Sequence, residues 1–376
     1  MLVIADDITG AAEMAGIAYC HGQQVRLLCS LCRPLCFPLC CDQVAAEETA
    51  TTVIASDTRS MTEEEAVAET HRITAHSSLA KPDSPLSPLP SHLFKKTDSA
   101  LRGHVVAELK TLIEITGKRR AVYLPANPSK GRIIKDGIYY INGTPIDQTD
   151  FSFDPEFPAR TAVLRERFPD AEANSILMPD AETIEDIQKI VATYEGEDTL
   201  FAGAADLFEA VLARNPRAAK TSRVPSPSRP SFASTIFLCG STQSKPLDIG
   251  IPVSPMPLDI YDGNNDTKEW LKDACTAYER EGSLMITIPH RHRTGKEVAV
   301  HLRKMTATLI QGLVAIRQPQ QLIIEGGASA FATLQHLGWT ELEVVSQLAP
   351  GVIKTKAPNG TFVIMKPGSY PWGSLF

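Results

Sequence analysis

The segment 93–104, with the sequence LFKKTDSALRGH, gathers several kinds of chemically active side chain at the exit of a predicted apolar strand. It contains two lysines, an arginine, an aspartate and two hydroxyl side chains ahead of its glycine. An arginine presents a planar fork to a carboxylate or phosphate, a lysine presents a point charge, and an aspartate accepts hydrogen bonds from hydroxyls. This mixture suits an anionic ligand that carries several hydroxyl groups. The alternative is a solvated turn between a strand and a helix.

Two adjacent acids, Asp6 and Asp7, follow a short apolar run at residues 1–5 that is predicted to be a buried strand. In parallel α/β sheets, ligands bind at the carboxyl ends of strands, beside helix N-termini whose free N–H groups favour oxygen ligands. One of the two acids is expected to cap the helix that starts around Thr9 and Gly10. The other is then available for different work.

Two arginines in the first half of the chain also follow predicted strands. Arg59, in the segment 56–60, is a candidate clamp for a substrate carboxylate, and the alternative is a salt bridge to a neighbouring acid such as Asp57. Arg132 closes the proline-rich segment 124–132, and we interpret it as a structural residue that orders this loop.

Three glycine-containing turns follow apolar runs in the second half of the chain: GSTQ at 240–243, EGGASA at 325–330 and KPGSY at 366–370. Glycine lets backbone N–H groups approach phosphate oxygens, so three such turns together indicate a nucleotide site, although each alone is equally typical of a plain tight turn. The chain has neither GxxxxGK[ST] nor GxGxxG, which argues against a P-loop kinase and a standard Rossmann dehydrogenase.

Composition narrows the class of protein. The 376 residues favour two domains, or three, and 37 basic against 44 acidic residues give a net charge of −7, which argues against nonspecific nucleic-acid binding. No apolar run has transmembrane length, and the N-terminal segment does not resemble a signal peptide. We therefore expect a cytoplasmic protein without nucleic-acid or membrane partners. The sequence does not determine the oligomeric state, and a homodimer is one assembly we consider.

Five of the eight cysteines, Cys29, Cys32, Cys36, Cys40 and Cys41, crowd into one short segment. Thiolates at such separations can converge on zinc or an iron–sulfur cluster. No second CxxC pair or nearby histidine completes a known zinc pattern, so we predict no metal site and keep a metal or redox protein as a third hypothesis.

Strand-like and helical segments alternate through the first two hundred residues, which predicts an α/β fold with mostly parallel sheets flanked by helices. An Asn-Gly turn within 138–146 predicts a hairpin. The predicted strands are 25–29, 52–55, 92–94, 121–124, 175–178, 199–202, 235–239, 283–288, 321–324 and 361–365, and the predicted helices are 63–76, 105–116, 160–167 and 181–194. A segment rich in proline, serine and arginine predicts a linker at 214–231 between a domain at 1–213 and a domain at 232–376.

Taken jointly, the motifs resemble those of the four-carbon acid sugar kinase family, formerly known only as a domain of unknown function. The likeness extends over nearly the whole chain. The matching segments are ADDITGA at 5–11, DTR at 57–59, KTDSALRG at 96–103, PANPSKGR at 125–132, INGTP at 141–145 with Thr149, DAET at 180–183 and APG at 349–351.

This resemblance implies two α/β domains with a ligand cleft between them. The first domain binds the sugar acid and the second binds ATP. The implied reaction is ATP-dependent phosphorylation of the terminal hydroxyl of threonate, erythronate or an oxo-tetronate, by a phosphotransferase with an alcohol acceptor. Mg²⁺ would bridge the ATP phosphates.

The resemblance also implies site residues. Those expected to bind the substrate are Asp6, Asp7, Arg59, Lys96, Thr97, Asp98, Ser99 and Arg102. Arg59 and Lys96 would hold the carboxylate, and Asp98 or Asp7 would be the catalytic residue that accepts or orients the hydroxyl proton. Those expected to bind the nucleotide are Ser241, Gly326, Gly327, Ala328, Ser329 and Gly368.

One departure keeps an alternative function open. The family usually has Gly-Gly-Asp-Thr where this chain has Gly326-Gly327-Ala328-Ser329. The second hypothesis is therefore a noncatalytic or weakened sugar-acid-binding or regulatory protein whose nucleotide site has degenerated.

Overall fold

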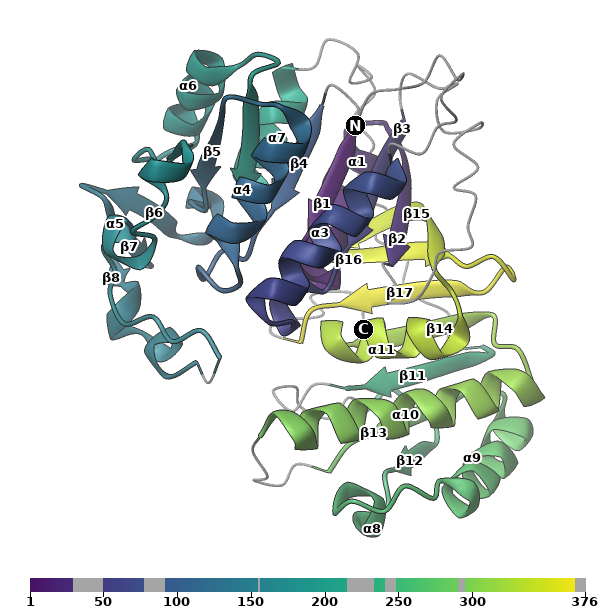
Figure 1. The fold of residues 1–376 in the computed structure, drawn as a ribbon. Helices are drawn as coiled ribbons and strands as arrows, with labels where there is room; N and C mark the ends of the chain where they lie inside the picture. The colour runs from purple at the N-terminus through teal and green to yellow at the C-terminus, as the bar shows by residue number, and fades with distance from the viewer. Residues whose placement is uncertain are drawn as a thin grey trace. The chain divides into compact units, whose positions relative to one another are not determined.

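The computed structural model describes residues 1–29, 50–77, 92–154, 156–214, 233–240, 248–289 and 295–368. The chain divides into two compact units (Figure 1). Unit 1 comprises Met1–Val25 and Cys32–Ser222, and unit 2 comprises Arg26–Leu31 and Arg223–Phe376. The predicted domain boundaries stay a prediction, because all of the predicted linker except Arg214 lies outside the described residues.

Among the described residues, the main sheet of unit 1 consists of parallel strands. In order across the sheet they are β3 (Ala50–Ala55), β1 (Leu2–Ala5), β4 (Leu93–Lys96), β10 (Thr199–Gly203), β5 (Arg120–Leu124) and β9 (Ile176–Leu177). The chain passes from β1 to β3 on one side and then crosses back to β4 on the other side. The carboxyl ends of β1 and β4 therefore form a topological switch point, where open α/β sheets bind ligands.

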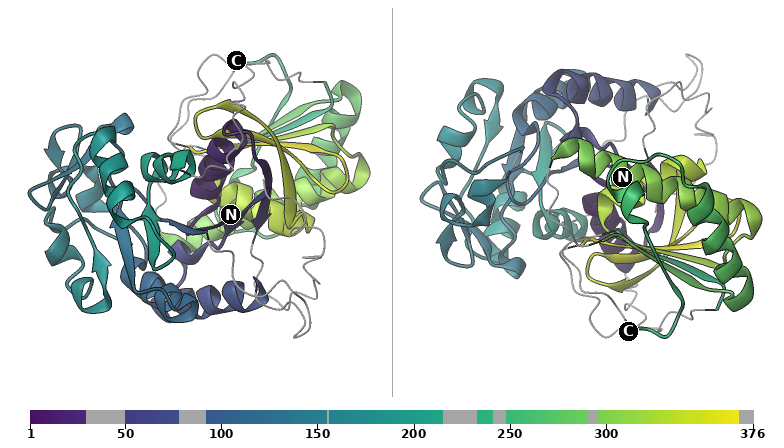
Figure 2. Two further views of the ribbon diagram at one scale, coloured as in Figure 1. Left: turned by 90° about the horizontal axis from the view of Figure 1, so that it is seen from above. Right: turned by 90° about the horizontal axis from the view of Figure 1, so that it is seen from below.

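Helices cover both faces of this sheet. The helices of unit 1 are α1 (Ile8–Cys20), α3 (Glu63–Ser77), α4 (Val105–Thr116), α5 (Leu164–Arg167), α6 (Ile184–Tyr194) and α7 (Ala205–Arg214). The helices α3 and α4 pack against each other on one face, and α1 packs against α7 on the other, as the left view of Figure 2 shows. The strands β1 and β4 are buried along their whole length, as expected for parallel strands covered on both faces.

A small antiparallel sheet follows β5 in unit 1. It contains β6 (Arg132–Lys135), β7 (Ile138–Ile141) and β8 (Thr144–Pro145). The turn between β7 and β8 holds Asn142 at φ 50° and Gly143 at φ 81°, the left-handed conformations that a two-residue hairpin turn needs. The predicted hairpin is confirmed.

Unit 2 contains a mixed sheet. Its strands, in order, are β12 (Val253–Pro255), β13 (Leu284–Thr287), β11 (Thr235–Cys239), β14 (Gln321–Glu325), β17 (Phe362–Lys366), β16 (Val352–Lys356), β15 (Glu341–Ala349) and β2 (Gln24–Cys29), which pairs with β15 through Arg26–Leu28. The first strands of this order are parallel to one another, namely β12, β13, β11, β14 and β17. The strands β16 and β15 are antiparallel to their neighbours. From β11 the chain goes to β13 on one side and then to β14 on the other, so β11 and β14 form a second switch point.

The helices of unit 2 are α8 (Leu258–Tyr261), α9 (Lys268–Glu281), α10 (Lys296–Ile316) and α11 (Gly327–Leu337). The helix α10 packs against α9 and α11. A buried apolar cluster from the strands stabilises the sheet, since burial of apolar area is the main favourable term in folding. Its members are Phe237, Met285, Ile323, Leu348, Val352 and Ile364.

The predicted fold class of mostly parallel sheets flanked by helices is confirmed in each unit. One predicted helix, at 160–167, is wrong in its first half: only Leu164–Arg167 is helical. The backbone just before it is used otherwise, because Tyr139 N donates to Ala162 O and Val163 forms a bridge with Ile138. The strands β6, β12, β15 and β16 were not predicted.

Candidate functional site

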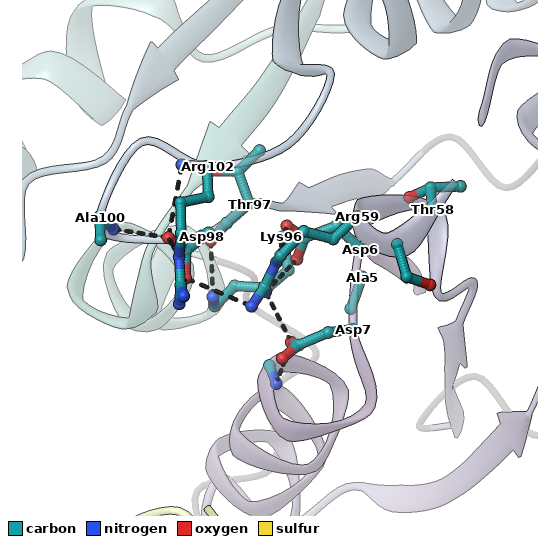
Figure 3. A network of polar contacts seen from close by, with 12 residues as sticks. Ala5, Asp6, Asp7, Thr58, Arg59, Lys96, Thr97, Asp98, Ala100 and Arg102 are labelled. Atoms are coloured by element: carbon teal, nitrogen blue, oxygen red, sulfur yellow. Dashed lines mark hydrogen bonds and ion pairs between the residues drawn. The ribbon is translucent and has the colours of Figure 1, made fainter. Parts of the chain in front are cut away.

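Arg59 is surrounded by aspartates at the switch point of unit 1 (Figure 3). It lies in the short 3-10 helix η1 (Thr58–Ser60), and its Nε and Nη2 donate to the two oxygens of Asp6, each at 3.1 Å. Its Nη2 also lies 3.0 Å from Asp7 Oδ1, and its Nη1 lies 3.6 Å from Asp98 Oδ1. Burial alone would lower the pKa of Arg59, but the three carboxylates raise it well above its usual value. The guanidinium is therefore a permanent cation that holds three acids together.

Asp7 has two structural partners besides Arg59. It caps α1, because its Oδ1 accepts from Gly10 N at 2.7 Å, and its Oδ2 accepts from Thr9 Oγ1. Burial would raise the pKa of Asp7, but the charges of Arg59 and Lys96 and these hydrogen bonds lower it. The prediction that one of the two acids caps the helix is confirmed, and the other, Asp6, is the bidentate partner of Arg59. At 18% exposure, the side chain of Asp7 is the most accessible of the three aspartates.

Asp98, two residues after β4, is held more tightly than Asp7. Its Oδ2 accepts from Arg102 Nε at 2.8 Å and from Ala100 N at 2.9 Å, while its Oδ1 accepts from Arg102 Nη2 at 3.0 Å. Arg102 also reaches Asp154, with Nη1 to Oδ2 at 3.4 Å. Burial would raise the pKa of Asp98, but Arg59 and Arg102 hold it far below its usual range. Such a carboxylate is ionised at any physiological pH and is a weak proton acceptor.

Lys96 and Thr97 complete the same edge of the sheet. Lys96 Nζ donates to Thr97 O at 2.6 Å, and both residues are buried. Thr97 Oγ1 is buried and has no hydrogen-bond partner among the described residues. A buried hydroxyl without a partner costs about 1–3 kcal/mol, so this atom is suited to contact a bound ligand.

A buried ion pair supports the turn that carries Arg59. Lys95 Nζ contacts Glu108 Oε2, which also accepts from Thr58 Oγ1 at 2.9 Å, and Thr58 Oγ1 lies 3.0 Å from Ser56 Oγ. All four side chains are buried. This pair was not predicted from the sequence. The available signal was an acid on the apolar stripe of α4, at Glu108 between Val105 and Leu112.

Ser99 is contacted from the small sheet. Arg132 Nη1 donates to Ser99 Oγ, and Tyr139 Oη donates to Ser99 O at 2.6 Å. The guanidinium carbons of Arg102 and Arg132 lie 5.9 and 6.0 Å from the ring centroid of Phe151. The structure thus brings every predicted substrate residue to one edge of unit 1, together with Arg132.

In unit 2, the predicted glycine turns follow three neighbouring parallel strands. Gly240 follows β11, Gly326 follows β14 and Gly368 comes two residues after β17. Gly240 N donates to Glu325 O at 3.0 Å, and Gly326 N donates to Lys366 O at 2.9 Å. The structure therefore brings these turns together at the switch point of unit 2. Ser241 lies outside the described residues.

The surroundings of these turns fit phosphate groups. A Cβ on Gly240 would come within 2.7 Å of Glu325 O and would also meet Ser329 Oγ, so only glycine fits this close approach. Gly326 is the N-cap of α11 at φ 101°, without a side-chain cap, and Gly327, Ala328 and Ser329 follow in the first turn of that helix. Backbone N–H groups at such a helix start favour anions.

A second buried ion pair lies beside these glycines. Lys366 Nζ is 2.6 Å from Glu325 Oε1, and their side chains are 1% and 2% exposed. Glu325 Oε2 is buried without a hydrogen-bond partner in the described part of the chain. Burial and the charge of Glu325 raise the pKa of the nearby Cys239 to about 12, so that thiol stays protonated at neutral pH.

No group of three histidine, cysteine, aspartate or glutamate residues placed to hold a metal ion occurs among the described residues. The cysteine cluster on which the third hypothesis depends lies, except for Cys29, outside the described residues. Within the described helices, none combines the length and apolar character needed to span a bilayer.

Both halves of the chain are similar to known protein families. A family model described as a sugar-binding N-terminal domain matches residues 1–186, and one described as a nucleotide-binding C-terminal domain matches residues 255–370. The chain is 27% identical over 158 residues to a D-threonate kinase of Salmonella typhimurium and 28% identical over 166 residues to a D-erythronate kinase of Heliobacterium modesticaldum. It belongs to the four-carbon acid sugar kinase family.

The sequence matches to these two kinases cover less than half of the chain, whereas a structural match covers all of it. The aligned parts cover 42% and 44% of this chain, and 33% and 34% of the two kinases. The chain thus spans about a third of the length of these curated relatives of the four-carbon acid sugar kinase family. The crystal structure of the Haemophilus influenzae protein HI1011, of family DUF1537, matches 100% of this chain and 98% of its own, with a TM-score of 0.69 at 18% identity. That match shows a shared fold.

Proposed function

We propose that this protein transfers a phosphoryl group from ATP to the terminal hydroxyl of a four-carbon sugar acid, such as threonate, erythronate or an oxo-tetronate. The observation that carries the proposal is the convergence of Asp6, Asp7 and Asp98 on Arg59 within the region matched by the sugar-binding model. Fixed carboxylates accept hydrogen bonds from several hydroxyls of one small polyol. The names of the related threonate and erythronate kinases support the same substrate class.

Asp7 is the proposed proton acceptor. Arg102 engages both oxygens of Asp98 at 2.8 and 3.0 Å, whereas Asp7 is more exposed and has no such fork on it. The substrate hydroxyl oxygen attacks the γ-phosphorus, the bond to the bridging oxygen of ADP breaks, and the hydroxyl proton passes to Asp7 and on to water. Because phosphoryl transfer proceeds through a loose transition state, orienting the hydroxyl matters more than basicity, so the lowered pKa of Asp7 is compatible with this role.

Unit 2 provides the proposed ATP site. The backbone N–H groups at the start of α11 and the turns at Gly240 and Gly368 would bind the phosphates. Glu325, with one buried oxygen lacking a partner among the described residues, is the carboxylate best suited to help hold Mg²⁺ beside Lys366. When bound, Mg²⁺ would neutralise charge on the phosphate oxygens.

The test is an assay that couples ADP release to NADH oxidation, run with D- and L-threonate, D- and L-erythronate and the oxo-tetronates. We expect turnover with at least one acid and background ADP release with ATP alone. Phosphorus NMR would show the new phosphate monoester. Background ADP release with every tetronate would exclude the proposed activity.

A noncatalytic sugar-acid-binding protein is the second candidate, and Ala328 favours it because the first turn of α11 contains no acid. It would show a rise in melting temperature with a tetronate and none with ATP and Mg²⁺. The kinase would respond to both ligands. Restoring the family's acid through Ala328→Asp separates the two further, since a degenerate site would gain ATP binding.

A further inference from the structure

The cations of the unit 1 site differ in how far their charge is already neutralised. Arg59 faces Asp6, Asp7 and Asp98, and Arg102 faces Asp98 and Asp154. Lys96 has no carboxylate within 4.0 Å among the described residues, but it lies close enough to Asp7 and Asp98 to lower the pKa of both. Four carboxylates thus oppose these three cations. A negatively charged ligand gains little from this group.

Among the arginines of this site that the structure describes, Arg132 is the exception. In the part of the chain that the structure describes, no carboxylate lies within 4.0 Å of its guanidinium, and its side chain has one hydrogen bond, from Nη1 to Ser99 Oγ. That contact and the shared ring of Phe151 place it beside the turn that contains Asp98 and Arg102. Arg132 therefore presents an uncompensated fork to the same edge of the sheet as the aspartates.

The sugar acid itself has two unlike ends. Its hydroxyls donate hydrogen bonds, which suits the aspartates, whereas its carboxylate only accepts them and would be repelled by the three acids around Arg59. A guanidinium without a carboxylate partner is the matching group, because its parallel N–H donors bind a carboxylate at two points.

We propose that Arg132, rather than Arg59, binds the carboxylate of the acid sugar, and that Arg59 instead fixes the three aspartates that receive the hydroxyls. This inference rests on the proposed function. It replaces two expectations from the sequence, the role of Arg59 as the carboxylate clamp and the purely structural role of Arg132. Ser99 Oγ, already bonded to Arg132, lies at the same position and adds a hydroxyl to it.

The experiment compares ligands with and without the charge. Calorimetry would measure the Kd of the tetronate that the wild type binds most tightly and of the corresponding tetronamide, whose amide replaces the carboxylate. For Arg132→Met we expect the Kd of the tetronate to rise about 10- to 100-fold, the effect of one charge-assisted contact. We expect the Kd of the amide to change less than about twofold, since the removed charge has no partner in that ligand. Arg132→Lys should recover part of the affinity for the tetronate.

A control variant tests for general damage. Arg120→Met removes an arginine of the same unit that lies outside the candidate site. The guanidinium carbon of Arg120 lies 5.3 Å from the ring centroid of Tyr194, and its Nε donates to Thr199 Oγ1. This variant should change neither Kd. An equal loss for tetronate and amide in Arg132→Met, or no loss for the tetronate, would overturn the inference. If the wild type binds tetronates but shows no phosphoryl transfer, the proposed function fails while the carboxylate assignment stands.

Discussion

The two units place their candidate sites at equivalent positions of similar sheets but build them from different groups. In unit 1, aspartates that follow β1 and β4 meet an arginine of η1 at the switch point, and each aspartate is held by arginine. In unit 2, glycine turns after β11, β14 and β17 leave backbone N–H groups near the edge of the sheet, with one ion pair buried below them. The topology determines where a ligand binds, and the local chemistry determines which ligand that is.

The difference matches the ligands proposed for each unit. A small polyol is recognised by fixed acceptors at defined positions, which needs side chains held in one rotamer by their neighbours. A triphosphate has many equivalent oxygens, which backbone N–H groups contact without side chains. We therefore expect substitutions in unit 1 to affect the sugar acid and those in unit 2 to affect the nucleotide, and the following predictions test that separation.

The largest effect should come from Asp7→Asn. Asparagine caps a helix as well as aspartate does, so α1 should keep its stability while the proton acceptor is lost. We expect kcat to fall by about 10²- to 10⁴-fold, with little change in the Kd for ATP, as measured by the coupled assay and by calorimetry. Asp170→Asn, at an exposed position of the same unit, is the matched control. An unchanged kcat would remove Asp7 from the mechanism.

The buried pair Lys95–Glu108 should be the next most sensitive feature. Replacing one partner leaves an uncompensated buried charge, so Glu108→Leu should lower the stability of unit 1 by about 3–5 kcal/mol. Thermal unfolding followed by circular dichroism would measure this loss. The double variant Lys95→Met/Glu108→Leu should regain much of the stability. If the double variant is no more stable than the single one, the pair is not the reason for the loss.

A smaller and more selective effect is expected for Gly240→Ala. The added methyl group would lie 2.7 Å from Glu325 O and against Ser329, which forces the turn to move and costs about 1–3 kcal/mol. The Kd for ATP should rise about tenfold or more, while the Kd for the tetronate stays constant. Gly338→Ala adds a methyl group where no atom lies within 4 Å but strains a backbone at φ 66°, so it controls for backbone strain in unit 2 without a clash beside the glycine turns. Weaker tetronate binding in Gly240→Ala would contradict the separation of the two sites.

The pH dependence of stability should be the smallest effect. The pKa values of Asp7 and Asp98 are lower in the folded state than the ordinary 3.8. Their contribution to stability is therefore complete above the ordinary value and is lost as the pH falls below it. Melting temperatures measured between about pH 3 and pH 6 should decline at the acidic end, and Asp98→Asn should make the decline shallower. An identical slope in Asp98→Asn would show that this carboxylate is not held by the arginines.

Much of the fold was predictable from local patterns. Buried parallel strands appear as short apolar runs, and the Asn-Gly turn requires two left-handed residues that few other pairs provide, so β5, β11 and the hairpin of β7 and β8 were found. The bounds of α4 agree with the predicted 105–116 because its amphipathic stripe ends at Gly117, which adopts φ 65°. The strands β15 and β16 form a hairpin of residues that are close in the chain, and they were missed because exposed polar residues alternate with buried ones and break the apolar run that marks a fully buried strand.

The candidate site likewise has features that were predictable from local sequence and features that were not. Sequence motifs identified the residues at the ends of β1 and β4 and the glycine turns, because strand ends and glycines have local signatures. These motifs could not show that Arg59 forms an ion pair with Asp6, which lies 53 positions away in the chain. Nor could they show that Arg132 has no carboxylate partner among the described residues. The sequence by itself determined which charges the protein has and which turns it makes. Only the tertiary structure decided which charges neutralise one another, because ion pairs form between residues that folding brings together from distant positions.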